Sequence, residues 1–438
     1  MSKNVQTRRI LFPVIVVVFL LFQHCPTQPQ DDPPEPGLLS VEYTAATEVW
    51  LRVQVPDSAD KPGLRIYRDD SMVVDFAKAP TDTVVIDTGP TPNTTYTYHT
   101  VRVRDSDEQS RSDPLTVTTL PTTSHHFTWT IDTLGQYGSY LRDVAIVNED
   151  NIWVVGNIET DSGEYNAAQW DGDQWHLMGI YSNTLDLYSI QYFAADDIWV
   201  TDVCSPIHWD GQEWTLYHLQ NMGLDACAGN AIWGSAPDDV YFVGSGGSIV
   251  HYDGSRFTRM ESGTALDLVD VTGSSAGVVA VGHSEGPESI ALLHTNQSDW
   301  TTLFTASSYL EDLSHGEYGR MTAVTVQGAV ASLISKAGVL HTHLPTETTR
   351  LIPERAAQLA ENDFIDLATT GPNDLLIGGV AGFLVHYNGA SWVREDRYAR
   401  PDVIGYVFRA VAVTPELAVM VGDIAWEGGV VIRGRRGS

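Results

Sequence analysis

The stretch "IHWDGQEW", Ile207 to Trp214, decides the fold because close variants of it recur along the chain. They read "AQWDGDQW" from Ala168, "IVHYDGSRF" from Ile249 and "VHYNGASW" from Val385. Glycine reaches positive φ without strain and Asp or Asn bonds its own backbone, so each stretch predicts a tight turn between two strands. The flanking aromatic residues predict packing pairs. The chain therefore repeats one hairpin at least four times.

This hairpin belongs to a longer repeating unit. The residue before the turn is Gln169, His208, His251, His294, His341, His386 or Arg433, at intervals of 39 to 47 residues. Each unit has an apolar strand before the hairpin, as in "DIWVTD" and "DVYFVG", and another before that, as in "YSIQYF" and "NAIWGS". Four strand patterns per unit at about 40 to 50 residues are typical of a β-propeller. Seven units predict seven blades.

The last unit lacks a fourth strand, because the chain ends at "VVIRGRRGS" after the third one. The stretch "FTWTIDTL", Phe127 to Leu134, precedes the first unit and carries Trp129 where other units have a fourth-strand aromatic residue. If this stretch completes the last blade, no sheet keeps an unpaired edge. We predict an all-β chain with a seven-bladed propeller over residues 124–438, closed by its N-terminal strand.

Five of the aligned residues are histidines, which raises the question of a metal site. Zinc needs its nitrogen ligands at about 2.0 to 2.1 Å from one point, whereas equivalent positions on different blades lie far apart. Gln169 and Arg433 at the same alignment position also break any ligand pattern. We predict that these histidines are structural and that the chain has no metal site.

Residues 38–120 contain strand-like runs such as "VWLRVQV" and "TYTYHTVRV" with turn residues between them. The segment "TDTVVIDTGPTPNTTYTYHTVRVRDSDEQSRSDPLTVTTLP" resembles the second half of a fibronectin type III domain. The resemblance implies a β-sandwich in which Tyr96 is the tyrosine corner. The Trp of the family's second strand is missing, because Trp50 stands too early. We predict a fibronectin type III-like sandwich, acting as a spacer, followed by the propeller.

The N-terminal residues 1–24 have the charge order and length of a signal peptide, with Lys3, Arg8 and Arg9 before the apolar run "ILFPVIVVVFLLF". An uncleaved signal anchor is the alternative. Cys25 and the Pro-rich segment 25–37 resemble the lipidation site and tether of a bacterial lipoprotein. The resemblance implies an acylated Cys25 and an exported protein, either a lipoprotein of the outer membrane and cell surface or an extracellular protein.

The formal charge is −31, from 56 acidic and 25 basic residues. Such a surface repels phosphate backbones, so nucleic acid is excluded as a partner. The hydrophobic fraction of 43% is ordinary for a folded protein. We predict a monomer that binds no nucleic acid.

Two cysteines remain in the exported part, Cys204 and Cys227. Cys204 falls in the turn between the second and third strands of one unit, and Cys227 in the connection to the next unit. Both therefore project from the same face, and we predict a disulfide between them. Closing this loop is worth about 3 kcal/mol in the chain-entropy model. Two unrelated buried thiols are the alternative.

The turns between second and third strands and the connections between units share one face of a propeller, here called the top face, and the Asp-Gly turns lie on the bottom. The first and last units have long top-face loops, "GNIETDSGEYN", "GDIAWEGG" and "REDRYARPDVIGYVF". Long loops on a rigid scaffold often carry recognition, and aromatic rings with Arg suit sugars or peptide carboxylates. The predicted ligand-binding residues are Trp426, Tyr406, Tyr398, Arg397, Arg400 and Tyr165.

Catalytic motifs are missing from the sequence. The units lack the Ser-x-Asp-x-Gly-x-x-Trp repeat of sialidases, and there is no P-loop, G-x-S-x-G or His-Glu-x-x-His pattern. Adjacent acids, such as Asp196 with Asp197 and Asp238 with Asp239, open a strand in two units and are predicted to be solvated turn residues. The sequence thus favours a non-enzyme, and we assign no catalytic residue and no cofactor.

The repeat style, "IWxVG" followed by "HWDGxxW", resembles uncharacterised bacterial secreted propeller lipoproteins. Our leading hypothesis is a non-catalytic binding protein that presents a propeller face to a glycan or protein ligand. One alternative is a carbohydrate-active enzyme, of glycosidase, lyase or glycosyltransferase type, on the top face. The other is a structural subunit of an envelope complex.

Overall fold

The computed structural model describes residues 35–56, 62–286, 288–295, 299–306, 320–335, 338–344, 348–351, 364–395, 405–425 and 427–437. The predicted signal peptide, the predicted lipidation residue Cys25 and the tether before residue 35 lie outside these ranges. Strands dominate the described part, which also holds one 3-10 helix, η1 (Leu219–Met222). None of its helices is long and apolar enough to cross a membrane.

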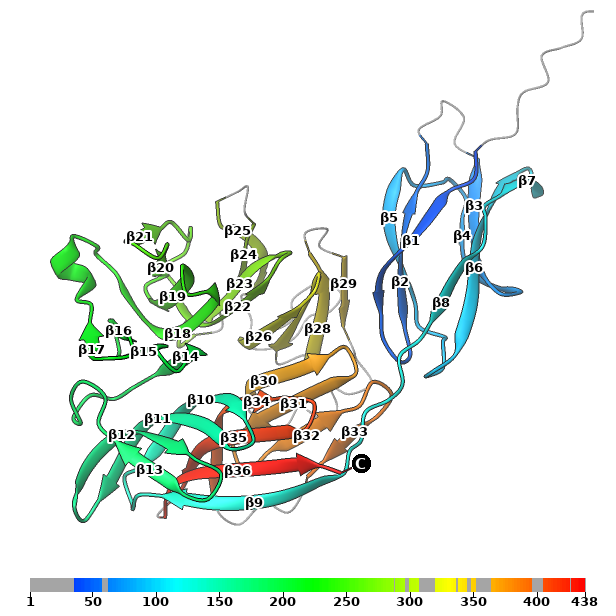
Figure 1. Cartoon of the computed structure of the whole chain (residues 1–438). Coiled ribbons are helices and arrows are strands. Elements are labelled where there is room, and N and C mark those ends of the chain that lie inside the picture. The colour runs from blue at the N-terminus through cyan, green and yellow to red at the C-terminus, as the bar shows by residue number, and fades with distance from the viewer. Residues whose placement is uncertain are drawn as a thin grey trace, which may run out of the picture.

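The N-terminal part is a sandwich of two sheets (Figure 1). One sheet has the order β1 (Leu38–Thr44), β2 (Val49–Gln54), β5 (Asp82–Asp87). The other has the order β4 (Ser71–Phe76), β3 (Gly63–Arg68), β6 (Thr95–Arg104), β7 (Asp107–Arg111), with β8 (Leu115–Thr118) also paired to β6. Leu51, Leu64 and Tyr98 are among the residues of the core. The Tyr96 hydroxyl accepts a hydrogen bond from the Thr91 amide at 2.9 Å, as a tyrosine corner would.

The rest of the described chain forms seven four-stranded antiparallel sheets, numbered here in chain order. Sheet 1 has β10 (Tyr140–Asn148), β11 (Asn151–Thr160), β12 (Gly163–Trp170) and β13 (Trp175–Met178). Sheet 2 has β14 (Ser189–Ala194), β15 (Asp197–Thr201), β16 (Pro206–Trp209) and β17 (Trp214–Leu216). Sheet 3 has β18 (Cys227–Ala236), β19 (Asp239–Ser245), β20 (Ile249–Tyr252) and β21 (Phe257–Met260). Sheet 4 has β22 (Asp267–Ser274), β23 (Gly277–His283), β24 (Ser289–His294) and β25 (Thr301–Ala306).

The remaining three sheets follow the same order of strands. Sheet 5 has β26 (Met321–Gln327), β27 (Val330–Ser335), β28 (Gly338–His343) and β29 (Thr348–Leu351). Sheet 6 has β30 (Phe364–Gly371), β31 (Asp374–Gly379), β32 (Leu384–Tyr387) and β33 (Trp392–Arg394). Sheet 7 has β34 (Tyr406–Val413), β35 (Leu417–Ile424), β36 (Gly428–Arg436) and β9 (Phe127–Leu134). The first strand of each sheet contacts that of the next, and β34 contacts β10, so the sheets form a closed ring (Figure 1).

The ring is closed by strand β9, the first strand after the sandwich. It pairs antiparallel with β36, from Leu134 opposite Gly429 to Phe127 opposite Arg436. Trp129 lies opposite Gly434, where any Cβ would collide with the indole ring. The two strands are the ones that the sequence predicts to pair, although Trp129 was expected beside Val430 to Arg433 and lies one residue further along. The pairing gives sheet 7 a fourth strand from the other end of the chain.

The recurring hairpin of the sequence forms the same tight turn in several sheets of the ring. In sheet 2, Asp210 Oδ1 accepts hydrogen bonds from the amides of Gln212 and Glu213, both at 2.9 Å, and the φ of Gly211 is 88°. The rings of Trp209 and Trp214 lie 5.5 Å apart. Asp171, Asp253 and Asn388 make the same turns in sheets 1, 3 and 6.

Three of the aligned histidines bond the acidic residue that opens the neighbouring strand. The pairs are His208 with Asp197 (3.1 Å), His251 with Asp239 (2.8 Å) and His386 with Asp374 (2.7 Å). Asp197 and Asp239, predicted to be solvated turn residues, keep 22% and 38% of their side chains exposed and in addition bond a histidine. His294 lies opposite Val278 and is one residue out of the alignment, since Leu293 takes the shared position opposite Val279. Within the described residues, no group of three or more His, Cys, Asp and Glu is arranged to hold a metal ion.

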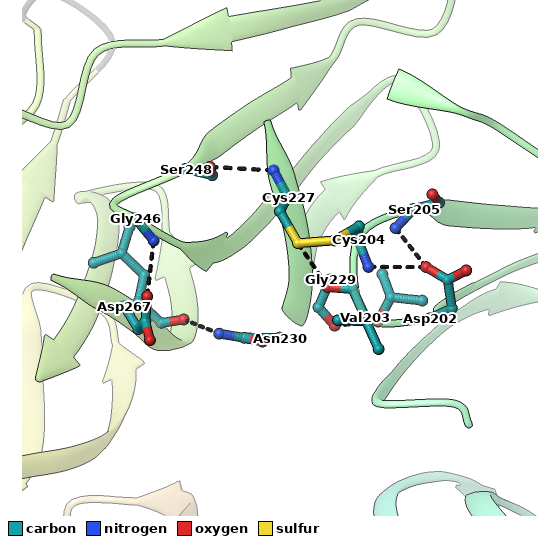
Figure 2. Close-up of a disulfide and its surroundings, with 12 residues drawn as sticks. Asp202, Val203, Cys204, Ser205, Cys227, Gly229, Asn230, Gly246, Ser248 and Asp267 are labelled. Carbon is teal, nitrogen blue, oxygen red and sulfur yellow. Dashed lines mark hydrogen bonds between the residues drawn. A yellow bond between two sulfur atoms is a disulfide. The ribbon is translucent and has the colours of Figure 1, made fainter. Parts of the chain in front are cut away.

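A disulfide joins Cys204 and Cys227 (Figure 2). Cys204 lies in the turn between β15 and β16, and Cys227 begins β18, so the bond links sheets 2 and 3. Asp202 Oδ1 shapes the turn by accepting hydrogen bonds from the amides of Cys204 (2.9 Å) and Ser205 (2.6 Å). The disulfide lies where the sequence predicts it, between the second-to-third strand turn of one sheet and the start of the next.

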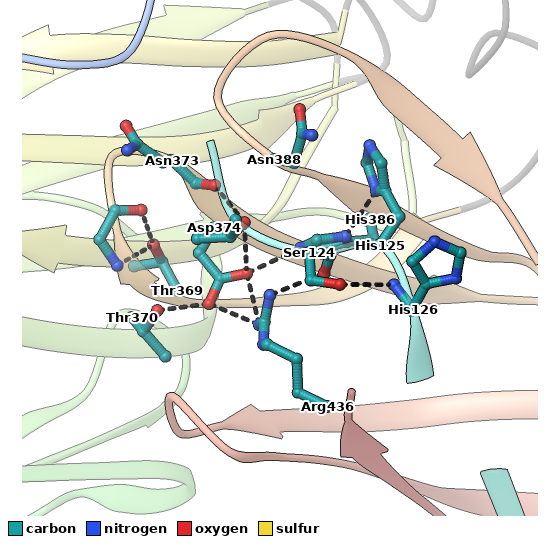
Figure 3. Close-up of polar contacts among 12 residues, drawn as sticks. Ser124, His125, His126, Thr369, Thr370, Asn373, Asp374, His386, Asn388 and Arg436 are labelled. Carbon is teal, nitrogen blue, oxygen red and sulfur yellow. Dashed lines mark hydrogen bonds and ion pairs between the residues drawn. The ribbon is translucent and has the colours of Figure 1, made fainter. Parts of the chain in front are cut away.

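The segment between the sandwich and β9 is tied to sheet 6 (Figure 3). His125 Nδ1 lies 2.7 Å from His386 Nδ1, and the carbonyl of Ser124 accepts a hydrogen bond from Arg436 at 3.0 Å. Arg436 also bonds both carboxylate oxygens of Asp374, at 2.6 and 2.7 Å. Burial would raise the pKa of Asp374, but hydrogen bonds from His386, Thr370 and Arg436 lower it. The ion pair of Asp374 with Arg436, together with the contacts of Ser124 and His125, fixes the place where β9 begins.

Candidate functional site

A central cavity of about 800 Å³ lies on the axis of the ring. Every first strand contributes to its wall, which includes Arg142, Ser189, Ala231, Asp270, Val324, Asp366 and Ala410. The first strand, the element of each repeating unit that lies closest to the axis, thus forms most of the wall. A cavity at such a position is the default place for a ligand in a ring of sheets.

A recurring β-bulge shapes this wall. The pairing of first and second strands shifts between Leu141 and Asp143, Leu268 and Asp270, Met321 and Ala323, Phe364 and Asp366, and Phe408 and Ala410. Glycines within the second strands make room for it: a Cβ on Gly156 or Gly422 would collide with the carbonyl oxygen of Tyr140 or Val407. A bulge redirects side chains, and here the residues at it line the cavity. This close approach explains why "VG" recurs in the second strands of several units.

Three aspartates in the wall connect neighbouring sheets. Asp143 Oδ2 accepts hydrogen bonds from the Ser189 hydroxyl at 2.7 Å and the Ile190 amide at 2.8 Å. Asp270 bonds the amide of Val324 at 2.8 Å, and Asp366 bonds that of Val411 at 2.7 Å. Each also accepts the amide of the residue that follows it, Val144, Val271 or Leu367. These carboxylates therefore hold sheet 1 to sheet 2, sheet 4 to sheet 5 and sheet 6 to sheet 7.

Burial shifts the titration of these three carboxyl groups. It raises the pKa of Asp143, and it raises the pKa of Asp270 to about 6. Burial together with the charge of Asp270 raises the pKa of Asp366 well above its ordinary value. Their hydrogen bonds to amides act in the opposite direction without cancelling the effect.

Cationic side chains gather at the top end of the cavity, where the first strands begin. The Arg142 guanidinium lies 4.0 Å from the centroid of the Tyr188 ring and 4.9 Å from that of Tyr140. Its Nη2 is 4.0 Å from Asp186, which accepts the Tyr140 hydroxyl at 2.6 Å. Arg409 lies 5.8 Å from the same Tyr140 ring. Two guanidinium groups thus share one aromatic platform.

Arg320 supplies a third guanidinium at this end, from the other side of the ring. Its Nη2 lies 3.1 and 3.0 Å from the two ring nitrogens of His283. Burial and the Arg320 charge lower the pKa of His283, so the imidazole is neutral at pH 7. We call Arg142, Tyr188, His283, Arg320 and Arg409 the mouth cluster, and all five line the cavity.

Some polar atoms of this region have no partner within the described part of the protein. They are Nε of Arg142, Nε of Arg320 and Oγ1 of Thr322, all of them buried and all belonging to residues that line the cavity. Buried donors usually have a hydrogen-bond acceptor. These three atoms are covered by protein, and the two guanidinium groups belong to residues that line the top end of the cavity.

The sequence predicted other ligand-binding residues on the top face. Trp426, Tyr398, Arg397 and Arg400 lie outside the described residues. Tyr165 in β12 packs against the core between sheets 7 and 1. Tyr406 in β34 packs near Phe408, with ring centroids 6.0 Å apart. Neither Tyr165 nor Tyr406 lines the cavity.

Sequence reasoning missed the mouth cluster. Its signal was present: "YLRDVAIV" and "VFRAVAV" carry Arg142 and Arg409 at equivalent places in otherwise apolar first strands. An arginine at the same place in two inner strands of a ring could have been taken as a site.

Comparison with known proteins identifies the fold. No family model matches the chain. No curated protein matches it. Among solved structures, YCF48 bound to D1 peptide is similar, with a TM-score of 0.53 and 16% identity over 72% of this chain and 97% of that chain. A chain of the mitotic checkpoint complex has a TM-score of 0.50 and 11% identity over 70% of this chain and 93% of that chain.

A third similar structure is the extracellular domain of a putative hybrid two-component system from B. thetaiotaomicron. Its TM-score is 0.50 and its identity 9%, over 71% of this chain and 40% of that chain. At such identities the likeness shows the fold alone. The ring of sheets is a β-propeller.

Proposed function

We propose that this protein is a non-catalytic binding scaffold that takes a protein or peptide ligand at the top end of its central cavity. In the proposal the ring counts seven blades, and the sandwich is a fibronectin type III domain. The protein is exported and monomeric, and a lipid on Cys25 holds it at the outer membrane or cell surface. One structure of this fold is described with a bound peptide, which supports a peptide ligand for the fold.

The guanidinium groups of Arg142 and Arg320 carry the proposal, because both residues line the cavity and, among the described residues, the one carboxylate paired with either of them is that of Asp186, 4.0 Å from Arg142. Guanidinium groups bind carboxylates with two parallel hydrogen bonds. A chain of formal charge −31 repels acidic partners in general, so arginines at one place restrict their approach to that place. The favoured ligand is therefore a peptide segment with a carboxylate.

A peptide is favoured over a glycan because of the aromatic surface. Sugars stack on exposed ring faces, whereas the Arg142 guanidinium lies 4.0 Å above the Tyr188 ring and occupies one of its faces. A glycan contact at the rim of the top face stays a second proposal. Its predicted residues are Trp426, Tyr406, Tyr398, Arg397, Arg400 and Tyr165.

An enzyme on the same face is the rival proposal. Among the described residues, the carboxyl groups that line the cavity are those of Asp143, Asp270 and Asp366, and each is bonded to two backbone amides. These bonds hold the sheets and leave little freedom for proton transfer, which favours binding over hydrolysis.

Selection of peptides tests the proposal on the full chain. Random dodecapeptides displayed on phage are selected against the wild-type protein and then measured against Arg142→Gln/Arg320→Gln and against Arg256→Gln. The control, Arg256, lies in the exposed turn of sheet 3. We expect peptides rich in Asp and Glu, with affinity at least about tenfold weaker for the double variant and unchanged for the control.

Two results would contradict the proposal: no peptide is selected, or the selected peptides bind the double variant as well as the wild type. A glycan array with turnover assays on the same preparations separates the rivals. Product formation there would favour the enzyme. Glycan binding without product would favour a glycan contact at the rim of the top face.

The lipid anchor has its own test. Cells that express the full chain are fed an alkyne analogue of palmitate, and label on the protein is measured for the wild type and for Cys25→Ser. We expect label on the wild type alone. Unlabelled wild-type protein, or equal label on Cys25→Ser, would contradict lipidation.

A further inference from the structure

Trp50 is buried although it lies on the face of β2 that points away from the sandwich core. Side chains alternate along β2, and its neighbours Leu51 and Val53 belong to the two-step pattern of the sandwich core. Leu51 and Val53 lie in that core, whereas Trp50 belongs to the outward face together with Arg52. Trp50 is nevertheless 0% exposed. Something outside the sandwich therefore covers it.

Sheet 5 of the propeller provides that cover. The ring centroid of Trp50 is 6.2 Å from that of His343, and the ring centroid of Tyr43 is 6.4 Å from that of His341. Glu42 Oε2 lies 3.0 Å from His343 Nε2. His341 and His343 are 1% and 2% exposed although β28 is near the outer edge of its sheet.

Sheet 6 holds the same hairpin from its other side. The amide of Ala46, in the turn between β1 and β2, donates to Asn373 Oδ1 at 3.1 Å. The Thr47 hydroxyl donates to the carbonyl of Gly389 at 3.0 Å. Gly389 belongs to the recurring tight turn, so the turn of sheet 6 contacts the sandwich.

One position in the seam between sheets 5 and 6 carries a smaller side chain than in the other seams. One position of the second strand carries Trp153, Trp199, Tyr241, Val279, Ser332, Leu376 and Val419 in sheets 1 to 7. Between sheets 2 and 3, Trp199 packs 5.1 Å from Tyr252 and 6.0 Å from Phe257. Sheet 5 has the small Ser332 there, opposite His341.

We infer that the sandwich is a built-in part of the ring, whose Tyr43 and Trp50 pack the seam between sheets 5 and 6 that Ser332 leaves open. This inference is independent of the proposed function. It makes the sandwich a fixed arm instead of a spacer that swings. The ring then keeps one orientation relative to Gly37, whose carbonyl is held by the Thr100 hydroxyl at 2.6 Å.

Amide hydrogen exchange of the full chain, read by mass spectrometry, tests the inference. Trp50→Ala removes the seam contact, and Val53→Ala on the same strand changes only the sandwich core. With Trp50→Ala we expect exchange in β28 and β32 to rise about tenfold or more, while β15 in sheet 2 stays as in the wild type. With Val53→Ala we expect faster exchange in β3 and β6, and the exchange rate of β28 should stay as in the wild type.

The inference is overturned if β28 and β32 exchange at wild-type rates in Trp50→Ala, or if Val53→Ala opens them equally. Trp50→Phe covers the case in which the alanine variant loses its fold. It keeps an aromatic ring of smaller volume and should show the same strands opening to a smaller extent. Uniformly faster exchange across all sheets of Trp50→Phe would also overturn the inference.

Discussion

His125 illustrates how one residue sets the response of the molecule to acid. Its ring lies against His386 where the closing strand enters the ring. Burial and the nearby His386 and Arg436 lower its pKa to about 4. In the unfolded chain the same group titrates near its ordinary value of 6.5. Between these values the unfolded chain binds more protons, so stability falls as pH falls from about 6.5 to about 4.

The raised pKa values of Asp270 and Asp366 act in the opposite direction over the same range, so the contribution of His125 is isolated by comparison with His125→Asn. We expect the urea midpoint of the wild type, followed by Trp fluorescence, to fall relative to that of His125→Asn from pH 7 to pH 5. A difference between the two midpoints that stays constant over this range would rule out this role of His125.

Single residues differ in how far the sequence determines their roles. The turn bonds of Asp171 and Asp253 could be predicted, because an Asx turn involves only residues up to three apart. The role of Arg320 could not, since it precedes β26 and stands outside the repeated strand pattern. The partner of Trp50 is more than 290 residues away in sequence, and no local pattern encodes it.

At the scale of the strand, the wall aspartates connect one sheet to the next. Asp270→Ala leaves the amides of Val271 and Val324 without their carboxylate acceptor. We expect a loss of about 2 to 4 kcal/mol in the free energy of unfolding. Asp161→Ala, in an exposed turn, is the matched control and should change little. Chemical denaturation measures both, and equal losses would contradict the connecting role.

The closing strand permits a second prediction at this scale. Gly434 faces the Trp129 ring, and Gly434→Ala should cost about 1 to 3 kcal/mol through overpacking. Combining it with Trp129→Leu should cost less than the sum of the two single changes, because the smaller side chain makes room for the added methyl. Additive costs in this double-mutant cycle would show that the two residues do not meet.

Over the whole ring, the Cys204–Cys227 bond links sheets 2 and 3. Reduction of the folded protein should lower its free energy of unfolding by about 3 kcal/mol, the value for a loop of this length. Calorimetry with and without dithiothreitol measures the effect, and Cys204→Ser/Cys227→Ser should no longer respond. An unchanged wild-type transition after verified reduction would contradict the stabilising role.

The architecture of the whole molecule was largely predictable because the repeating units are written one after another. Closure followed from a missing strand at one end and a surplus strand at the other, and β9 pairs with β36 accordingly. The docking of the sandwich on sheets 5 and 6 was not predictable. It rests on contacts between residues far apart in sequence, such as Trp50 with His343 and Ala46 with Asn373.

The claim that the top end of the cavity binds an acidic peptide is tested most directly by a crystal structure of the full chain with a selected peptide. The account predicts a peptide carboxylate within hydrogen-bond distance of the Arg142 or Arg320 guanidinium. A peptide seated on the tight turns of the bottom face, or on the sandwich, would contradict it.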